Sequence, residues 1–319
     1  MVKDTIFATL IAFAIATILG PITIPFLRRL KIGQTVREEG LESHYKKNGT
    51  PTMGGIMIII AVLISSIIFE LKYPDTYPVL ILTVGFGLVG FLDDYIKVVK
   101  KQSMGLRSWQ KMGLQFLIAG GFCAYTMYFQ DWDLTMKVPF LPGKEIDFKW
   151  ATIPMMFLVI LGTDTGTNFT DGLDGLASSV TAIVATFFGL VAIRFDNPVA
   201  PICGAILGAL MGFLVFNAHP AKVFMGDTGA LALGGFVSGT AIALKMPLFI
   251  LIVGLIYFVE VLSVILQVSY FKITKGKRIF KMAPIHHHFE KCGWSETKVV
   301  TVFSIVTVLC CMVAWLGVW

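Results

Sequence analysis

Charged residues are scarce in this chain of 319 residues. Lysine, arginine, aspartate and glutamate together make up 14% of it, against about 25% in soluble globular domains. Hydrophobic residues make up 56%, and the mean hydropathy is +0.79. This composition excludes a disordered protein, a collagen and an ordinary cytosolic enzyme.

Cysteine is also scarce, and the five cysteines form no C-x-x-C pair. Four lie in apolar blocks, so we interpret all five as reduced core residues, which excludes a disulfide framework and a zinc site. The sequence has no P-loop and no G-x-S-x-G, H-E-x-x-H or haem motif. Residues 85–90 match G-x-G-x-x-G without a preceding strand. We expect these glycines, like Gly204, Gly208 and Gly212, to allow close helix packing.

The apolar residues occur in blocks of about 15 to 25, the length that crosses a hydrocarbon core about 30 Å thick. The blocks do not alternate apolar and polar residues, which excludes a barrel and leaves helices. We therefore predict an all-α polytopic membrane protein with one integral-membrane domain, residues 1–319. Ten transmembrane helices are expected near residues 5–27, 53–70, 78–92, 112–129, 151–163, 175–193, 200–216, 228–244, 247–271 and 298–318. The third and fifth look short, and the ninth is long enough to tilt, bend or leave the bundle.

Basic residues are divided unevenly between the two sides that ten spans define. One side holds the linkers 28–52, 93–111, 164–174, 217–227 and 272–297. These linkers contain 18 lysines and arginines, whereas the other side contains seven, so the first side is expected to be cytoplasmic and both termini extracytoplasmic. A Pro-Gly turn in the outer segment 130–150 predicts a small hairpin. The net charge of +6 reflects orientation and anionic lipid, so no nucleic-acid partner is expected.

Acidic residues on the predicted cytoplasmic side gather where spans end. Asp93 and Asp94 close the third span, Asp164 follows the fifth, and Asp227 precedes the eighth. Ionisable groups near the membrane are costly and are functional candidates. The alternatives are boundary charges at Asp93 and Asp94 and a helix cap at Asp227.

Two further motifs carry polar side chains at suggestive spacing. Asn168, Asp171 and Asp174 are three residues apart, so they share one face if the segment is helical, and they can hold a divalent cation or bind sugar hydroxyls. The alternative is a glycine-rich turn with aspartate caps. The histidines at 286–288 are cationic phosphate binders, neutral ligands or solvated loop residues. The basic segment 44–55 is a topology anchor or a flexible cationic arm over an anionic substrate.

Acids and basic residues without an obvious nucleophile beyond aspartate favour phosphoryl transfer with Mg²⁺. Five segments occur in order: HYKKNGTPTMGG, FLDDYIKV, NFTDGLDGLA, FMGDTGALALGG and MAPIHHHFEKCGW. Together they resemble the phospho-N-acetylmuramoyl-pentapeptide transferases (the MraY family), a branch of the polyprenyl-phosphate N-acetylhexosamine-1-phosphate transferases. The likeness covers nearly the whole chain. Asp164 departs from it, because a less acidic residue is expected there.

The resemblance implies transfer of phospho-MurNAc-pentapeptide from UDP-MurNAc-pentapeptide to undecaprenyl phosphate, which gives lipid I and UMP in peptidoglycan synthesis. It also implies Mg²⁺ as cofactor, a homodimer, and an active site on the cytoplasmic face of the bacterial inner membrane. The catalytic residues it implies are Asp93, Asp94, Asp227 and His287. Asp227 would bind Mg²⁺, and Asp93 would face the lipid phosphate as base or nucleophile, supported by Asp94.

The same resemblance implies a set of substrate-binding residues. These are Lys46, Thr50, Lys97, Lys111, Asn168, Asp171, Asp174, Asn217, Phe224, Gln267, His286 and His288. In this set Phe224 would stack on uracil, Asn168 and the two aspartates would line the nucleotide-sugar side, and the lysines and histidines would meet phosphate or sugar.

Two other functions remain open from the sequence. A transporter of anionic solutes would explain polar residues among ten spans, but the acids crowd one face, whereas a transporter site lies near the midplane. Glu260 is the clear acid well inside a span, and one acid makes a poor translocation path. A sister transferase that uses UDP-N-acetylglucosamine is the other alternative.

Overall fold

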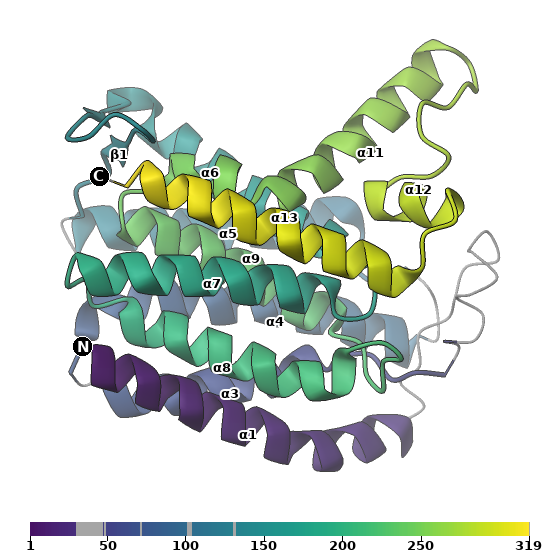
Figure 1. Ribbon diagram of the computed structural model, residues 1–319, viewed down its shortest axis with the longest axis horizontal. Coiled ribbons are helices and arrows are strands. Elements are labelled where there is room, and N and C mark those ends of the chain that lie inside the picture. Colours follow the sequence, from purple (N-terminus) through teal and green to yellow (C-terminus); the bar gives the residue numbers. More distant parts are fainter. Residues whose placement is uncertain (30–46, 48, 71, 101–103, 130–131, 319) are drawn as a thin grey trace.

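The computed structural model describes residues 1–29, 47, 49–70, 72–100, 104–129 and 132–318. These residues are mostly helical, and the long helices lie side by side (Figure 1). The α-helices are α1 (Val2–Arg29), α3 (Gly55–Glu70), α4 (Tyr77–Val99), α5 (Ser108–Tyr128), α6 (Thr152–Thr170), α7 (Leu176–Arg194), α8 (Ala200–Asn217), α9 (Gly226–Ala243), α10 (Ile250–Val253), α11 (Leu255–Ile273), α12 (Ile285–Lys291) and α13 (Glu296–Leu316). Three short 3-10 helices complete them: η1 (Pro74–Thr76), η2 (Lys149–Ala151) and η3 (Pro247–Phe249).

Six of these helices are long and apolar enough to cross a membrane: α1, α4, α7, α8, α11 and α13. The central pair, α7 and α8, has 72% of its most apolar window buried, whereas α11 and α13 have 22% and α1 has 28%. Apolar side chains on the outer helices therefore face outward. Such exposure is stable in lipid and costly in water, so the chain is a multi-pass membrane protein.

Each of the ten segments predicted to span the membrane contains helix. The prediction that the third and fifth are short is wrong, because α4 has 23 residues and α6 has 19. Asp93, Asp94 and Asp164 lie inside these helices and are buried there, not beyond their ends. Partners from neighbouring helices, described below, allow the helices to continue past the carboxylates.

The ninth segment departs from the bundle, as its length indicated. It breaks at Gly254 between α10 and α11, and α11 then points away from the neighbouring helices (Figure 1).

The predicted hairpin is also confirmed. Strand β1 (Met136–Lys137) pairs antiparallel with β2 (Glu145–Ile146). Gly143, in the turn between them, has a φ of +69°, a conformation that favours glycine.

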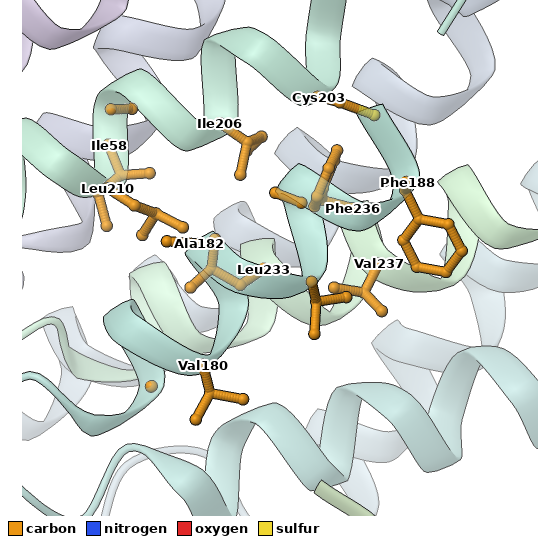
Figure 2. Close-up of a cluster of buried hydrophobic side chains, with 14 of the residues drawn as sticks. Ile58, Val180, Ala182, Phe188, Cys203, Ile206, Leu210, Leu233, Phe236 and Val237 are labelled. Atoms are coloured by element: carbon orange, nitrogen blue, oxygen red, sulfur yellow. The ribbon is translucent and has the colours of Figure 1, made fainter. Parts of the chain in front are cut away.

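The core lies between α3, α7, α8 and α9. Figure 2 shows aliphatic and aromatic side chains from these four helices meeting in one cluster, among them Ile58, Phe188, Leu210 and Phe236. In α9 nearly every residue is buried, so this helix is enclosed on all sides. Because α9 begins at Gly226, its first turn is held firmly against the helices around it.

Small residues set the distances between helices, as predicted for the glycines spaced by four. A Cβ atom at Gly208 would lie 2.0 Å from the backbone oxygen of Thr9 in α1, and one at Gly204 would lie 2.5 Å from that of Thr5. The same holds between α4 and α9, where a Cβ at Gly90 would lie 2.1 Å from the backbone oxygen of Asp227. Glycine is required at these contacts because any side chain would separate the helices.

Both chain termini lie at one end of the bundle, close to the β1 end, and α12 lies at the other end (Figure 1). The last turn of α4 and the first turn of α9 belong to the α12 end. The acidic residues of α4 and α9 are therefore remote from the termini.

Replacing Gly208 by alanine is expected to lower the stability of the chain, because α1 and α8 must separate. Overpacking of this kind costs about 1–3 kcal/mol. Detergent-induced unfolding of the purified chain, followed by tryptophan fluorescence, measures it. Gly113→Ala in α5 is the matched control, because nothing lies within 4 Å of a Cβ there. Equal destabilisation by both variants would contradict the close α1–α8 contact.

Candidate active site

Three carboxylates from two helices meet at the α12 end of the bundle. Asp93 and Asp94 lie near the end of α4, and Asp227 lies in the first turn of α9. One carboxylate oxygen from each lies within 4.8 Å of the other two. We call these three residues the acidic centre. Their convergence depends on the close packing of α4 on α9.

Asp227 is held by side chains from three other helices. Its Oδ2 accepts hydrogen bonds from Lys97 Nζ at 2.8 Å and Lys111 Nζ at 3.0 Å. Its Oδ1 accepts one from Asn168 Nδ2 at 2.8 Å. These contacts bring together four residues that the sequence analysis placed in the site from separate motifs.

The neighbouring carboxylates are fixed differently. Asp94 Oδ2 accepts hydrogen bonds from the backbone and hydroxyl of Thr228, at 2.9 and 2.7 Å, so it caps the first turn of α9. Asp93 Oδ2 pairs with Lys97 Nζ at 2.6 Å, and its Oδ1 accepts a hydrogen bond from the backbone of Leu106 at 2.7 Å. Asp94 is thus fixed by the first turn of α9, whereas Asp93 is held by one lysine and one backbone N–H.

Charge at the acidic centre is not balanced within the residues described. Lys97 and Lys111 supply two positive charges to three carboxylates, and Lys97 also lies 3.8 Å from Asp94. An excess of buried negative charge favours binding of a further cation, and carboxylate oxygens are the ligands that Mg²⁺ prefers.

Asp164, the departure from the family pattern, lies in the middle of this region but does not join the acidic centre. It is fully buried in α6, and its Oδ2 accepts a hydrogen bond from Gln115 Nε2 at 2.5 Å. Its Oδ1 has no hydrogen-bond partner among the described residues. The partner Gln115 comes from α5, and no motif in the sequence singled it out.

A second polar cluster lies beside the loop that follows α6. Asp174 accepts hydrogen bonds from Lys47 Nζ at 2.7 Å and from the backbone of Ala221 at 3.0 Å, and it lies 3.1 Å from His219 Nδ1. Glu296 Oε1 accepts hydrogen bonds from the same lysine at 2.5 Å and from the backbone of Asp174 at 2.6 Å. The Lys47 ammonium joins these two carboxylates and lies 5.9 Å from the centre of the Phe224 ring.

The segment that carries Asn168, Asp171 and Asp174 is not helical throughout, so the three side chains do not share one face, and the alternative of a glycine-rich turn holds for residues 171–175. Helix α6 ends at Thr170, and Asp171 to Gly175 form a turn before α7. Gly175, the residue that precedes α7, adopts a φ of +78°, a conformation that favours glycine. Asn168 consequently points into the acidic centre, whereas Asp174 belongs to the second cluster.

Asp171 lies between the two clusters. Burial raises the pKa of its carboxyl well above the ordinary value, and the charges of Asp227, Asp94 and Asp174 raise it further. A hydrogen bond from the backbone of Gly226 opposes this rise. The carboxylates of both clusters are therefore close enough to influence Asp171 together. A cation bound in this region would be stabilised by all of them.

The three histidines begin α12 and point in different directions. His286 is 1% exposed and its Nδ1 lies 3.0 Å from Oε2 of Glu260, which is 0% exposed in α11. A Cβ at Gly172 would lie 2.2 Å from His286 Nε2, so this ring packs against the loop after α6. His287 Nδ1 lies 2.8 Å from Glu290, and His288 Nδ1 accepts a hydrogen bond from the backbone of Lys281 at 3.1 Å.

The remaining predicted residues have structural partners of their own. Asn217 accepts hydrogen bonds from the backbone of Gly175 and donates one to that of Val223, so it joins two loops. Gln267 accepts hydrogen bonds from the backbones of Ile279 and Phe280. Thr50 donates its backbone N–H to Lys47. Lys46 lies outside the described residues, and the substrate-binding roles of all these residues stay predictions.

Sequence reasoning missed several residues of the site. Lys47 lies in the basic arm that the sequence analysis singled out, but it was not among the predicted binding residues, and its neighbour Lys46 lies outside the described residues. His219 follows the end of α8 in no distinctive motif, and Glu296 looks like an ordinary acid in the first turn of α13. Contacts of this kind span 45 to 249 positions in the chain, so local pattern cannot reveal them.

The fold and the site define a class of protein before any relative is considered: a multi-pass membrane protein with buried carboxylates, paired with lysines, at one end. A model of glycosyl transferase family 4 matches residues 76–245, which contain all three residues of the acidic centre. The phospho-N-acetylmuramoyl-pentapeptide-transferase signature 1 matches residues 47–59.

Relatives of known name agree over the full chain. The phospho-N-acetylmuramoyl-pentapeptide-transferase of Caldicellulosiruptor bescii is 52% identical over 312 residues, which cover 98% of this chain and 96% of that protein. That of Clostridium perfringens (strain 13) is 51% identical, with 97% of each covered, and that of Bacillus cytotoxicus is 47% identical, with 97% and 96% covered. The chain belongs to the phospho-N-acetylmuramoyl-pentapeptide-transferase family.

The contact between Glu260 and His286 is expected to stabilise the fold, because both side chains are buried and His286 Nδ1 lies 3.0 Å from Glu260 Oε2. Removing one partner of a buried pair costs about 3–5 kcal/mol. A double-mutant cycle with Glu260→Gln and His286→Gln, read by detergent-induced unfolding, should give a coupling of about 1–3 kcal/mol.

The exposed pair of Asp4 and Lys72 is the control for that cycle. Its atoms are 2.6 Å apart, but the Lys72 side chain is 62% exposed. The cycle with Asp4→Asn and Lys72→Gln should give about 0–1 kcal/mol. A coupling at Glu260 and His286 no larger than this control value would refute their stabilising role.

Proposed function

We propose that this chain transfers phospho-MurNAc-pentapeptide from UDP-MurNAc-pentapeptide to undecaprenyl phosphate, with lipid I and UMP as products. The observation that carries the proposal is the convergence of Asp93, Asp94 and Asp227 with Lys97 and Lys111 in a member of this family. Both substrates are anionic, and the lysines provide the positive charge that phosphate groups require.

In the proposed reaction, an oxygen of the lipid phosphate attacks the phosphorus that carries the sugar. The bond between that phosphorus and the bridging oxygen of the diphosphate breaks, and UMP leaves with the electron pair. A phosphate monoester has a second pKa of about 6, so undecaprenyl phosphate is mostly dianionic at neutral pH. Proton removal by Asp93 contributes little, and we assign Asp93 to orienting the attack. A phospho-enzyme trapped without lipid would replace direct attack by a covalent mechanism.

The residues of the acidic centre fit Mg²⁺. Their three carboxylates offer oxygen ligands within 4.8 Å of one another and exceed the neighbouring lysines by one charge. We assign Asp227 as the principal ligand, with Asp93 and Asp94 beside it. When bound, Mg²⁺ neutralises charge on the diphosphate. Lys97 and Lys111 are placed to bind phosphate oxygens, and Asn168 keeps the Asp227 carboxylate oriented.

The second cluster supports a nucleotide site. Lys47 is hydrogen-bonded to Asp174 and lies 5.9 Å from the centre of the Phe224 ring, so a cation, a carboxylate and an aromatic ring are available within one region. A uracil ring has a face for stacking and donors and acceptors on its edge. We therefore place the uridine there and the diphosphate toward Lys97, with Asp171 between them.

We also propose ten spans, with both termini outside and the acidic centre on the cytoplasmic face of the bacterial inner membrane. In support, each predicted segment contains a helix, the two termini share one end of the bundle, and the excess of basic residues lies at the other. The homodimer and the single-domain boundary at 1–319 stay predictions from the resemblance and from the sequence.

Replacing Asp227 by asparagine is expected to lower UMP release about 10²- to 10³-fold, because the centre loses the proposed principal ligand for Mg²⁺ and the charge that positions Lys97 and Lys111. The measurement is UMP release by the detergent-purified chain with UDP-MurNAc-pentapeptide, undecaprenyl phosphate and Mg²⁺, each omitted in turn. Asp196→Asn, an exposed aspartate near the hairpin end, is the control and should keep full activity.

Other outcomes of that assay distinguish the alternatives. Release from UDP-N-acetylglucosamine would move the chain to the sister branch. Absence of release from either donor, in protein whose unfolding transition is intact, would favour an anion transporter. Full activity in Asp227→Asn would remove the acidic centre from the mechanism.

The proposed orientation predicts where a membrane-impermeant maleimide reacts in intact cells. Lys144→Cys, in the hairpin, should be labelled from outside. Cys292, which follows α12 and is exposed, should be labelled only after permeabilisation. The other cysteines are buried or partly buried in helices, so they contribute a low background. Labelling of Cys292 in intact cells, with Lys144→Cys protected, would reverse the orientation.

A further inference from the structure

A hollow of about 350 Å³ lies at the hairpin end of the bundle, remote from the acidic centre. Its walls come from the hairpin, the end of α7, the loop that leads into η3, and the end of α13. It is lined by Lys137, Val138, Leu141, Pro142, Gly143, Lys144, Glu145, Arg194, Phe195, Met246, Phe249, Gly317 and Val318. Nothing in the transferase mechanism uses these residues.

Positive charge prevails in this hollow. Lys137, Lys144 and Arg194 line it, and Glu145 is the acid among the lining residues. Glu145 shares the Lys245 ammonium with Asp133, because Lys245 Nζ is hydrogen-bonded to Asp133 and lies 3.5 Å from Glu145 Oε2. Lys137 and Lys144 form no ion pair with another described residue, so their two positive charges remain for an anion.

Lys137 is the best-defined cation of the hollow. Its Nζ lies 4.3 Å from the centre of the Phe195 ring, and the backbone N–H of Lys137 donates to the carbonyl of Lys245 at 2.7 Å. Partial burial lowers the pKa of Lys137 below its ordinary value, with Glu145 and Lys245 acting in opposite directions. A half-buried ammonium held over an aromatic ring gains from an anion placed beside it.

The rest of the hollow is apolar. Leu141, Phe195, Met246 and Phe249 line it beneath the cations, and Val318 follows the end of α13. Helix α13 leaves most of its apolar side chains facing outward. A ligand that suits this surface has an anionic group joined to hydrocarbon, which describes a phospholipid better than a free ion.

The distribution of basic residues gives an independent reason. The predicted outer side holds seven of them: Lys3, Lys72, Lys137, Lys144, Lys149, Arg194 and Lys245. Three line the hollow and Lys245 lies between Asp133 and Glu145 at its edge, so four of the seven gather at this place. Lysine and arginine are disfavoured on that side, and their concentration at one hollow indicates a ligand.

We propose that this hollow binds the phosphate of an anionic phospholipid headgroup, with Lys137, Lys144 and Arg194 around the phosphate and an acyl chain along α13. The site requires that the chain spans the membrane, and it does not depend on the transfer reaction. Free inorganic phosphate would meet the same cations, so the experiment must separate the two sources.

The test uses the full chain in detergent, with bound lipid counted by native mass spectrometry as phosphatidylglycerol or phosphatidylcholine is titrated. The double variant Lys137→Gln/Lys144→Gln should weaken phosphatidylglycerol binding at least about tenfold and leave phosphatidylcholine unchanged. The control is Lys3→Gln/Lys149→Gln, which removes the same charge on the same predicted side outside the hollow. UMP release should be normal in both, which shows that the variants fold.

Three results would overturn the proposal. Wild-type affinity for phosphatidylglycerol in the hollow variant would exclude these lysines from binding. An equal loss in the control variant would show general surface attraction. Inorganic phosphate that binds alone and displaces phosphatidylglycerol, with the same dependence on the two lysines, would make the hollow a site for free phosphate.

Discussion

The pairing of Asp227 with Lys97, Lys111 and Asn168 is the interaction on which the organisation of this end of the molecule depends. The four residues come from α9, α4, α5 and α6, so one carboxylate joins four helices. The contact is available only because α4 approaches α9 at Gly90, where a Cβ would lie 2.1 Å from the backbone of Asp227. Backbone packing therefore comes first, and the electrostatic network follows from it.

Buried charges persist in a membrane protein only where partners offset their loss of hydration. At the acidic centre the negative charge is only partly neutralised, since three carboxylates share two lysines. An incompletely balanced centre does not attract a diphosphate by itself, because its residual charge is negative. In the proposed reaction the lysines exchange carboxylate contacts for phosphate contacts, and we propose that Mg²⁺ takes their place. This is the physical reason for expecting a metal ion at Asp227, and it arises from the charges and not from the family.

Much of the fold follows from hydropathy, because burial of long apolar blocks in lipid leaves little choice but helices. The errors fall where charge interrupts those blocks. Asp93 and Asp94 were expected to end a helix, since an unpaired carboxylate in hydrocarbon is costly, but Lys97 and Thr228 provide partners and α4 continues. The cost of burying a charge can be judged from the sequence. The partner that offsets this cost is known only from the folded structure.

The same reasoning explains which site residues were recognisable. Asp227 and Asn168 lie in motifs whose resemblance to a family is specific, and the structure brings them into contact. Glu260 was noticed only as an acid inside a span. Its contact with His286 depends on two features of the chain. The break at Gly254 sets the direction of α11, and the segment between α11 and α12 then brings His286 back to Glu260. That geometry depends on the path of a loop, and hydropathy contains no information about it.

At each end of the bundle, the residues of the less common charge form a cluster. The α12 end has most of the basic residues, and its functional candidates are the minority acids, held by lysines and backbone donors. The hairpin end has few basic residues, and four of them gather at a hollow whose lining acid, Glu145, shares Lys245 with Asp133. Charges that agree with the bias of their side contribute to orientation and are individually replaceable. Acids at the α12 end and basic residues at the hairpin end do not contribute to orientation. A local ligand or partner is therefore the physical explanation for their clustering.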